Sequence, residues 1–167
     1  LPRGRHRATF GEVEGAFVSA PAYSGSTTRS QLWTDLRTAV DALADFGVFE
    51  DLWLGGSFLT SKQDPGDIDL TLITNVRQFD DVAAGARGAE LADTLAAARS
   101  LPTLDLYLLG WVNSDTCPPA DVDVYLKYRG YWDDWWQRDR DPRGRSAADH
   151  TALPKRGYVE VGLNDYV

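Results

Sequence analysis

Two aspartates two residues apart are the residues best suited to chemistry in this sequence. Asp67 and Asp69 alternate with the apolar Ile68 and Leu70, a pattern typical of a strand with one buried face. Residues i and i+2 of a strand point to the same side and lie about 7 Å apart along the backbone. The two carboxylates can therefore converge on a divalent cation, and we expect Mg²⁺ or Mn²⁺ as the cofactor.

A glycine-rich turn precedes these aspartates in the chain. Gly55 and Gly56 interrupt a short apolar segment that we expect to be a strand, and Ser57 is expected to begin a helix. Glycines leave backbone N–H groups unobstructed, and amides at the start of a helix favour bound phosphate. Lys62, in the polar loop that follows, either reaches a phosphate or is simply solvated. These four residues are the predicted nucleotide-binding residues.

The two features together suit nucleotidyl transfer, in which an NTP gives its NMP group to an acceptor hydroxyl and pyrophosphate leaves. The reaction requires a triphosphate held in line and its developing negative charge neutralised by a metal ion. Each feature alone is common, because Gly-Gly-Ser is a frequent turn and Asp-x-Asp is frequent at exposed strand edges. Their succession at this short spacing favours the functional interpretation.

The segments Leu54-Gly55-Gly56-Ser57 and Gly66-Asp67-Ile68-Asp69-Leu70 resemble the signature of the DNA polymerase beta-like nucleotidyltransferase superfamily. The resemblance implies the minimal fold of that superfamily, an α/β (α+β) domain with a small mixed β-sheet flanked by helices. More specifically, the chain resembles a group of small bacterial proteins within the superfamily. That likeness covers residues 1–18, 52–70, 135–140 and 154–159.

The superfamily usually carries a third carboxylate on a later strand, which serves as a metal ligand or as the base for the acceptor's proton. Asp105 is our candidate, because an acid between the apolar Leu104 and Leu106 needs a metal or a hydrogen-bond partner. Asp123 is the rival, and a strand-edge residue without a role is the other alternative. The predicted catalytic and metal-binding residues are therefore Asp67, Asp69 and Asp105.

Hydrophobic spacing predicts the elements that must position these residues. Helices are expected over 31–46, 79–98 and 125–138, and strands over 49–54, 67–73, 104–109 and 158–163. The aromatic residues of the segment 125–138 favour core packing over a platform for stacked bases. Residues 1–29 are expected to be an irregular arm of one domain that covers residues 1–167.

Composition limits the partners that we expect. The formal net charge is −8, which disfavours a nucleic-acid substrate, so the predicted partners are an NTP, ATP first, and a protein or small-molecule acceptor. No apolar run is long enough for a membrane span, and the single cysteine, Cys117, suits a reducing cytoplasm. The alternative hypothesis is a non-catalytic nucleotide-, metal- or partner-binding module, such as one half of a toxin–antitoxin pair.

Overall fold

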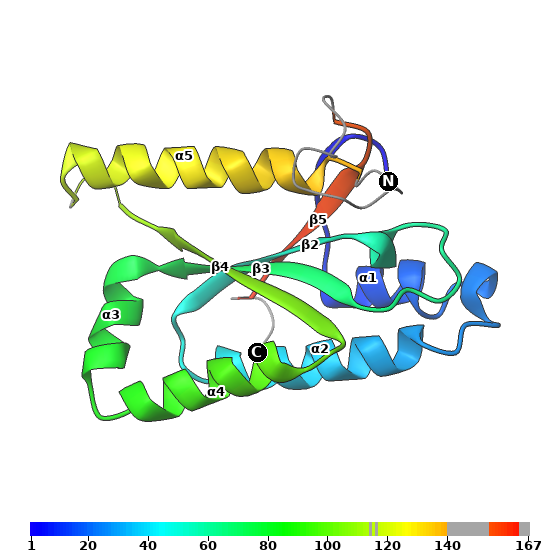
Figure 1. Cartoon of the computed structure of the whole chain (residues 1–167), viewed down its shortest axis with the longest axis horizontal. Coiled ribbons are helices and arrows are strands. Elements are labelled where there is room, and N and C mark those ends of the chain that lie inside the picture. Colours follow the sequence, from blue (N-terminus) through cyan, green and yellow to red (C-terminus); the bar gives the residue numbers. More distant parts are fainter. Residues whose placement is uncertain (114, 116, 140–153, 164–167) are drawn as a thin grey trace.

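The structure, a computed structural model, describes residues 1–113, 115, 117–139 and 154–163. Its centre is a mixed sheet of five strands, namely β1 (Gly4–Arg7), β2 (Phe49–Gly55), β3 (Ile68–Asn75), β4 (Leu104–Trp111) and β5 (Gly157–Gly162). Their order across the sheet is β1-β5-β2-β3-β4 (Figure 1). The pairs β1–β5 and β3–β4 are parallel, whereas β2 is antiparallel to both of its neighbours.

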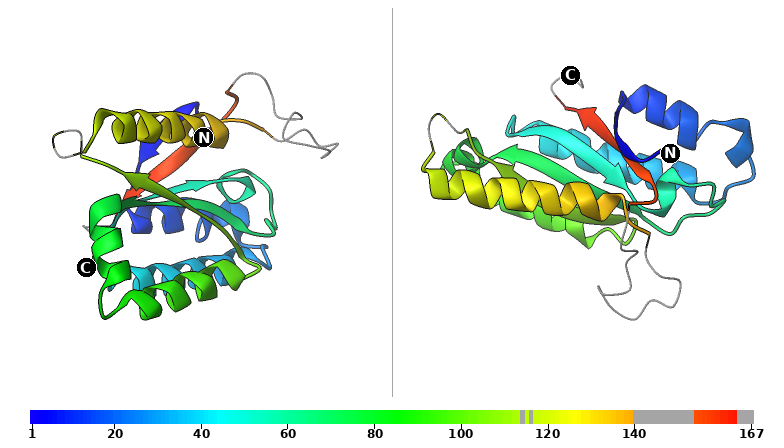
Figure 2. Two further views of the ribbon diagram at one scale, coloured as in Figure 1. Left: turned by 60° about the vertical axis from the view of Figure 1, so that its left-hand side comes forward. Right: turned by 90° about the horizontal axis from the view of Figure 1, so that it is seen from above.

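Helices cover the two faces of this sheet unequally. The described helices are α1 (Phe10–Phe17), α2 (Arg29–Ala44), α3 (Val76–Ala84), α4 (Gly88–Ser100) and α5 (Pro119–Trp136). Figure 2 shows α5 along one face, while α1, α2 and α4 lie against the other. A mixed sheet flanked by helices is the α+β arrangement that the sequence predicts.

The face toward α2 and α4 carries the main core. Leu52 and Leu54 of β2 pack there with Leu70 and Leu72 of β3, and all four side chains are buried. Side chains alternate along a strand, so a slip of one residue would move this whole apolar set to the other face. Burial of these leucines therefore fixes which residues of β2 and β3 point toward α5.

The face toward α5 carries a smaller core that is rich in aromatic rings. Its buried members are Trp53, Ile73, Leu109, Trp136 and Tyr158. The indole Nε1 of Trp136, at the end of α5, donates a hydrogen bond of 3.0 Å to the buried hydroxyl of Thr71 on β3. This bond joins the C-terminal end of α5 to the middle of the sheet.

The expectation of an irregular arm over residues 1–29 is wrong. Its first residues form β1, which pairs with β5, and α1 begins at a capping box in which Thr9 and Glu12 exchange hydrogen bonds. A strand of four residues is too short to show alternation, so the sequence pattern missed it. The capping box is present in the sequence as Thr-x-x-Glu and was the available signal.

Two further elements differ from expectation. The single helix expected over 79–98 is two helices, because α3 ends at Ala84 before Gly85, which has an extended backbone. Helix α5 begins at Pro119, before the expected start, so Asp123 lies exposed on a helix instead of on a strand. None of the helices in the described part of the chain has the length and apolar character needed to cross a membrane.

Candidate functional site

The glycine turn, Gly55 to Ser57, comes at the end of β2 and lies directly against β3, the strand that carries Asp69. Gly55 pairs with Asp69 of β3, and the chain then turns at Gly56 with a φ of 71°. A Cβ at position 56 would lie 1.6 Å from Asp69 Oδ2. Glycine is needed here for two reasons, namely its left-handed backbone and the space taken by the carboxylate.

The helix expected at Ser57 is a single 3₁₀ turn, Ser57–Leu59. Such a turn has almost no helix dipole, so phosphate binding at this position would depend on the backbone amides. Lys62 lies in the following loop with an exposed side chain, while its backbone N–H donates to Thr60 Oγ1 at 3.2 Å. The predicted phosphate contact of Lys62 stays a prediction.

A buried arginine, Arg29, holds this loop in shape. Only 1% of its surface is exposed, and its guanidinium lies 3.8 Å from the centroid of the Tyr23 ring. Burial lowers the pKa of Arg29, with opposing contributions from Tyr23 and Asp64. Its N–H groups donate to the carbonyl oxygens of Phe17, Phe58, Thr60, Lys62 and Gln63.

Sequence reasoning missed Arg29, because an arginine at the start of a helix looks like a surface residue. Four of the five carbonyls that it binds lie in the segment between the glycine turn and the aspartates, and the fifth, that of Phe17, is at the end of α1. Asp64 fixes the far side of that segment by accepting hydrogen bonds from Thr27 N at 2.7 Å and Ser26 Oγ at 3.1 Å. These bonds, that from Thr27 N first, hold the pKa of Asp64 below its usual range.

The structure brings Asp69 and Asp105 side by side. They are register partners on the parallel strands β3 and β4, where neighbouring strands lie about 4.8 Å apart. Both point toward α5, because Thr71 and Tyr107, two residues further along each strand, contact Trp136 of that helix. Of the two candidates for a third carboxylate, Asp105 is therefore the one beside Asp69.

Asp67 precedes β3 and is partly exposed. Within the described ranges, no three His, Cys, Asp or Glu side chains are grouped so that they could hold a metal ion. The predicted metal-binding role of Asp67, Asp69 and Asp105 stays a prediction. Tyr107 donates its hydroxyl to Asp105 Oδ2 at 2.8 Å and so orients that carboxylate. Sequence reasoning missed this contact, although the two residues are two positions apart on one strand and so point to the same side.

Aromatic rings of α5 border the site. A Cβ at Gly55 would lie 2.5 Å from Trp136 Cε3, so the indole packs directly on that glycine. Trp132 stacks on Trp136 with 5.7 Å between ring centroids, and its ring lies 4.6 Å from that of Tyr107. Trp136 is buried in the core, as expected, whereas Tyr128 is 55% exposed and does not serve core packing.

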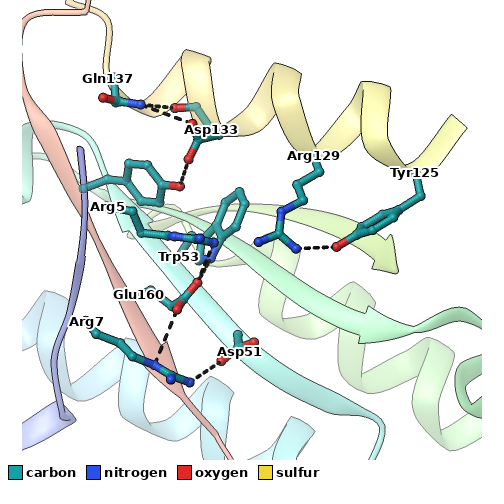
Figure 3. A network of polar contacts seen from close by, with 10 residues as sticks. Arg5, Arg7, Asp51, Trp53, Tyr125, Arg129, Asp133, Gln137 and Glu160 are labelled. Atoms are coloured by element: carbon teal, nitrogen blue, oxygen red, sulfur yellow. Dashed lines mark hydrogen bonds and ion pairs between the residues drawn. The ribbon is translucent and has the colours of Figure 1, made fainter. Parts of the chain in front are cut away.

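A network of polar contacts continues from the site along the same face (Figure 3). Glu160 accepts hydrogen bonds of 2.9 Å from Trp53 Nε1 and from Arg5, and Arg7 lies 3.5 Å from its other oxygen. Burial, with the nearby charge of Glu160, raises the pKa of Asp51, against the opposing effect of the arginines. The network links β1 and β5 to β2, the strand that ends in the glycine turn.

The same network fastens α5 to the sheet. Tyr158 of β5 donates its hydroxyl to Asp133 of α5, and burial raises the pKa of Tyr158 well above its usual range, so the donor proton is retained. Gln137, just after the helix, accepts from Gly4 N at 3.0 Å. Helix α5, and with it Trp136, is thereby held in one position over Gly55.

No curated protein and no solved structure matches the chain. One family model matches it, over residues 1–162 of 167. That region includes every described element, from β1 to β5. The glycine turn, the paired aspartates and α5 therefore all lie within the matched region. The chain belongs to this family, the family of unknown function DUF6932.

Proposed function

We propose that this protein is a Mg²⁺-dependent nucleotidyltransferase that moves an NMP group from an NTP to an acceptor hydroxyl. The contact between the Gly56 backbone and the Asp69 carboxylate carries the proposal, with Asp105 in register beside it. Transfer from a metal–triphosphate complex requires a phosphate-binding turn directly against a metal-binding carboxylate. The resemblance of this turn and strand to the polymerase beta-like signature supports the same conclusion.

The acids present suit Mg²⁺, which takes one or two protein carboxylates together with phosphate oxygens and water. Asp69 and Asp105 would hold the ion, with Asp67 as a further ligand at the start of β3. Bound there, Mg²⁺ would supply neutralisation of the charge that develops on the reacting phosphate. Tyr107 would keep the Asp105 carboxylate in a fixed orientation through its hydrogen bond to Oδ2.

The glycine turn would hold the phosphates. Backbone amides of Gly55, Gly56 and Ser57 would donate to the β- and γ-phosphates, and the exposed Lys62 side chain would add a positive charge. ATP is the first NTP to test. A net charge of −8 favours a protein or a small molecule as the acceptor over a nucleic acid.

A thermal-shift panel of the four NTPs, each with Mg²⁺ or Mn²⁺, tests the binding step. A ligand that binds only the folded state stabilises it by an amount that grows with the logarithm of its concentration over Kd, so at least one NTP with metal should raise the melting temperature. Asp69→Asn should lose this metal-dependent stabilisation, whereas Asp123→Asn, at an exposed position of α5, should keep it. No stabilisation by any NTP with either metal would contradict the proposal.

Transfer itself is tested with α-labelled NTPs and candidate protein or small-molecule acceptors. The label should move to an acceptor only when metal is present, and both Asp69→Asn and Asp105→Asn should abolish the movement. Gly66→Ala, in the loop between the glycine turn and β3, is the matched control. Nothing lies within 4 Å of a Cβ there, so this variant should keep label transfer.

The second candidate function is a nucleotide-binding module without catalysis. The hydrogen bond from Tyr107 to Asp105 favours it, because an oxygen engaged by a tyrosine hydroxyl is less available as a base for the acceptor's proton. Saturable, metal-dependent NTP binding without label transfer to any acceptor would select this function. Tyr107→Phe distinguishes the two functions further. If the wild type transfers no label and this variant does, the hydrogen bond from Tyr107 to Asp105 is what prevents transfer.

A further inference from the structure

A cleft of about 1110 Å³ lies at the far end of β3 and β4 from the paired aspartates. It is bounded by residues of α3, by the last residues of β4 and by α5 from Asp121 to Trp132, toward the end of the molecule where α3 and the start of α5 lie (Figure 1). Its β3 boundary, Asn75, is six positions along the strand from Asp69, or about 20 Å. The cleft adjoins the candidate nucleotidyltransferase site at Trp132, whose ring lies 4.6 Å from that of Tyr107, but Asp69 and Asp105 do not line it.

One wall of the cleft is aromatic. Tyr125, Tyr128 and Trp132 line it, and their spacing of three and four residues places them along one side of α5. Trp132 is held in place by ring contacts with Tyr107 and Trp136. Tyr128 is 55% exposed although it is large and apolar, so packing within the chain does not explain it.

The charges around the cleft are mainly negative. Asp80 and Asp81 of α3 and Asp121 of α5 line it, and Arg77 is the one cation among the lining residues. The guanidinium of Arg129 lies behind this lining and donates a hydrogen bond of 2.6 Å to the hydroxyl of Tyr125, so Tyr128 and Trp132 are the rings left for a bound cation. Helix α3 does not offer its first amides to an anion, because two of them already donate to Asn75 Oδ1. Among the described residues, the lining therefore suits a cation better than an anion.

We propose that this cleft binds a small organic ammonium ion. Aromatic faces attract an ammonium group through their quadrupoles, and carboxylates at an exposed rim raise the local concentration of a cation. The volume is at the upper end of the roughly 300 to 1000 Å³ of small-molecule sites, so the ligand has room for an apolar body beside its charge. This inference is independent of the proposed nucleotidyl transfer and concerns a different part of the sheet.

Choline, titrated by calorimetry, is the probe. Its matched controls are the uncharged alcohol in which carbon replaces the ammonium nitrogen, and inorganic phosphate. A cation–π site should prefer choline to the neutral analogue by about tenfold or more. Equal binding of the two, a preference for phosphate, or no saturable choline binding up to millimolar concentration would overturn the proposal.

Matched variants on α5 test the location. Tyr128→Leu should weaken choline binding, whereas Tyr131→Leu should not, because Tyr131 is similarly exposed, at 51%, but does not line the cleft. Asp121→Asn should weaken binding and Asp123→Asn should leave it unchanged, since only Asp121 lines the cleft. All four positions are exposed, so folding of these variants can be verified by circular dichroism.

Cys117 gives a second readout, because it is the only cysteine of the chain and it lines the cleft. Choline should slow its alkylation by iodoacetamide in the wild type and should not do so in Tyr128→Leu. Unchanged alkylation at saturating choline would show that the ion binds elsewhere and would overturn the assignment. NTP-dependent stabilisation, measured on the same variants, tests the other site separately.

Discussion

The backbone of Gly56 lies so close to the carboxylate of Asp69 that a Cβ at position 56 would be 1.6 Å from Asp69 Oδ2. The two residues come from different strands and meet because Gly55 pairs with Asp69 across β2 and β3. A ligand bound by the turn therefore also meets the carboxylate, which makes the contact the natural place to test the site.

Gly56→Ala should destabilise the protein by about 2 kcal/mol or more, because an alanine there is strained at a φ of 71° and displaces the carboxylate. Stabilisation by NTP and metal should be lost with it. Urea unfolding and the thermal-shift panel measure the two effects. Gly66→Ala is the control, and retention of the NTP response in Gly56→Ala would show that the contact is not needed for binding.

Arg29→Lys should cost about 3 kcal/mol of unfolding free energy. Lysine keeps the charge but cannot reach the set of carbonyls that the guanidinium binds, and buried carbonyls lose their donors. The same substitution at Arg99, an exposed residue of α4, should change stability by less than about 0.5 kcal/mol. Equal effects at the two positions in urea unfolding would mean that Arg29 does not organise the loop.

Thr71→Val should cost about 2 kcal/mol, because it leaves the buried indole N–H of Trp136 without its acceptor. In a Trp136→Phe background the same change should cost much less, since the donor is then absent. A double-mutant cycle in urea measures this difference as a coupling energy. Simple addition of the two single costs would indicate that the hydrogen bond does not fasten α5 to the sheet.

Asp51→Asn should stabilise the protein near neutral pH. Burial and Glu160 raise the pKa of Asp51 although Arg7, Arg5 and Arg129 oppose them, so the folded state binds the proton more tightly than the unfolded chain. The stability that the protonated group contributes is fully present below the ordinary aspartate pKa, about 4, and is lost as pH rises through the folded-state pKa.

The advantage of Asp51→Asn over the wild type should therefore be largest near neutral pH and should vanish in acid. Urea midpoints measured across this range give the comparison. A variant that is less stable than the wild type at neutral pH would mean that the pairing of Asp51 with the arginines outweighs the cost of burying its charge.

The sequence predicts those parts of the site that depend on local pattern. The alternation around Asp69 is long enough to indicate a strand, and an acid between leucines marked Asp105, which lies in register with it. Asp123 has the same kind of apolar neighbours but lies on a helix. An acid between two apolar residues is too short a pattern to distinguish the two-residue period of a strand from the 3.6-residue period of a helix. Local pattern therefore could not decide between Asp105 and Asp123 as the third carboxylate.

Contacts between distant segments explain what the sequence could not predict. Arg29 acquires its role from carbonyls more than ten residues away, and Tyr107 is packed against Trp132 and Trp136 of another element. The exposure of Tyr128 likewise depends on where α5 crosses the sheet. Side-chain type and spacing carry no information on such pairings.

The position of β5 between β1 and β2 has a consequence for folding. Strand β1 precedes the other four described strands in the chain, yet its partner, β5, is the last of them. Closing so long a loop is slow, and until it closes β1 has no neighbour in the sheet and β2 has an open edge. We therefore infer that the nascent chain assembles β2, β3 and β4 first, and that completion of the sheet must await the arrival of β5.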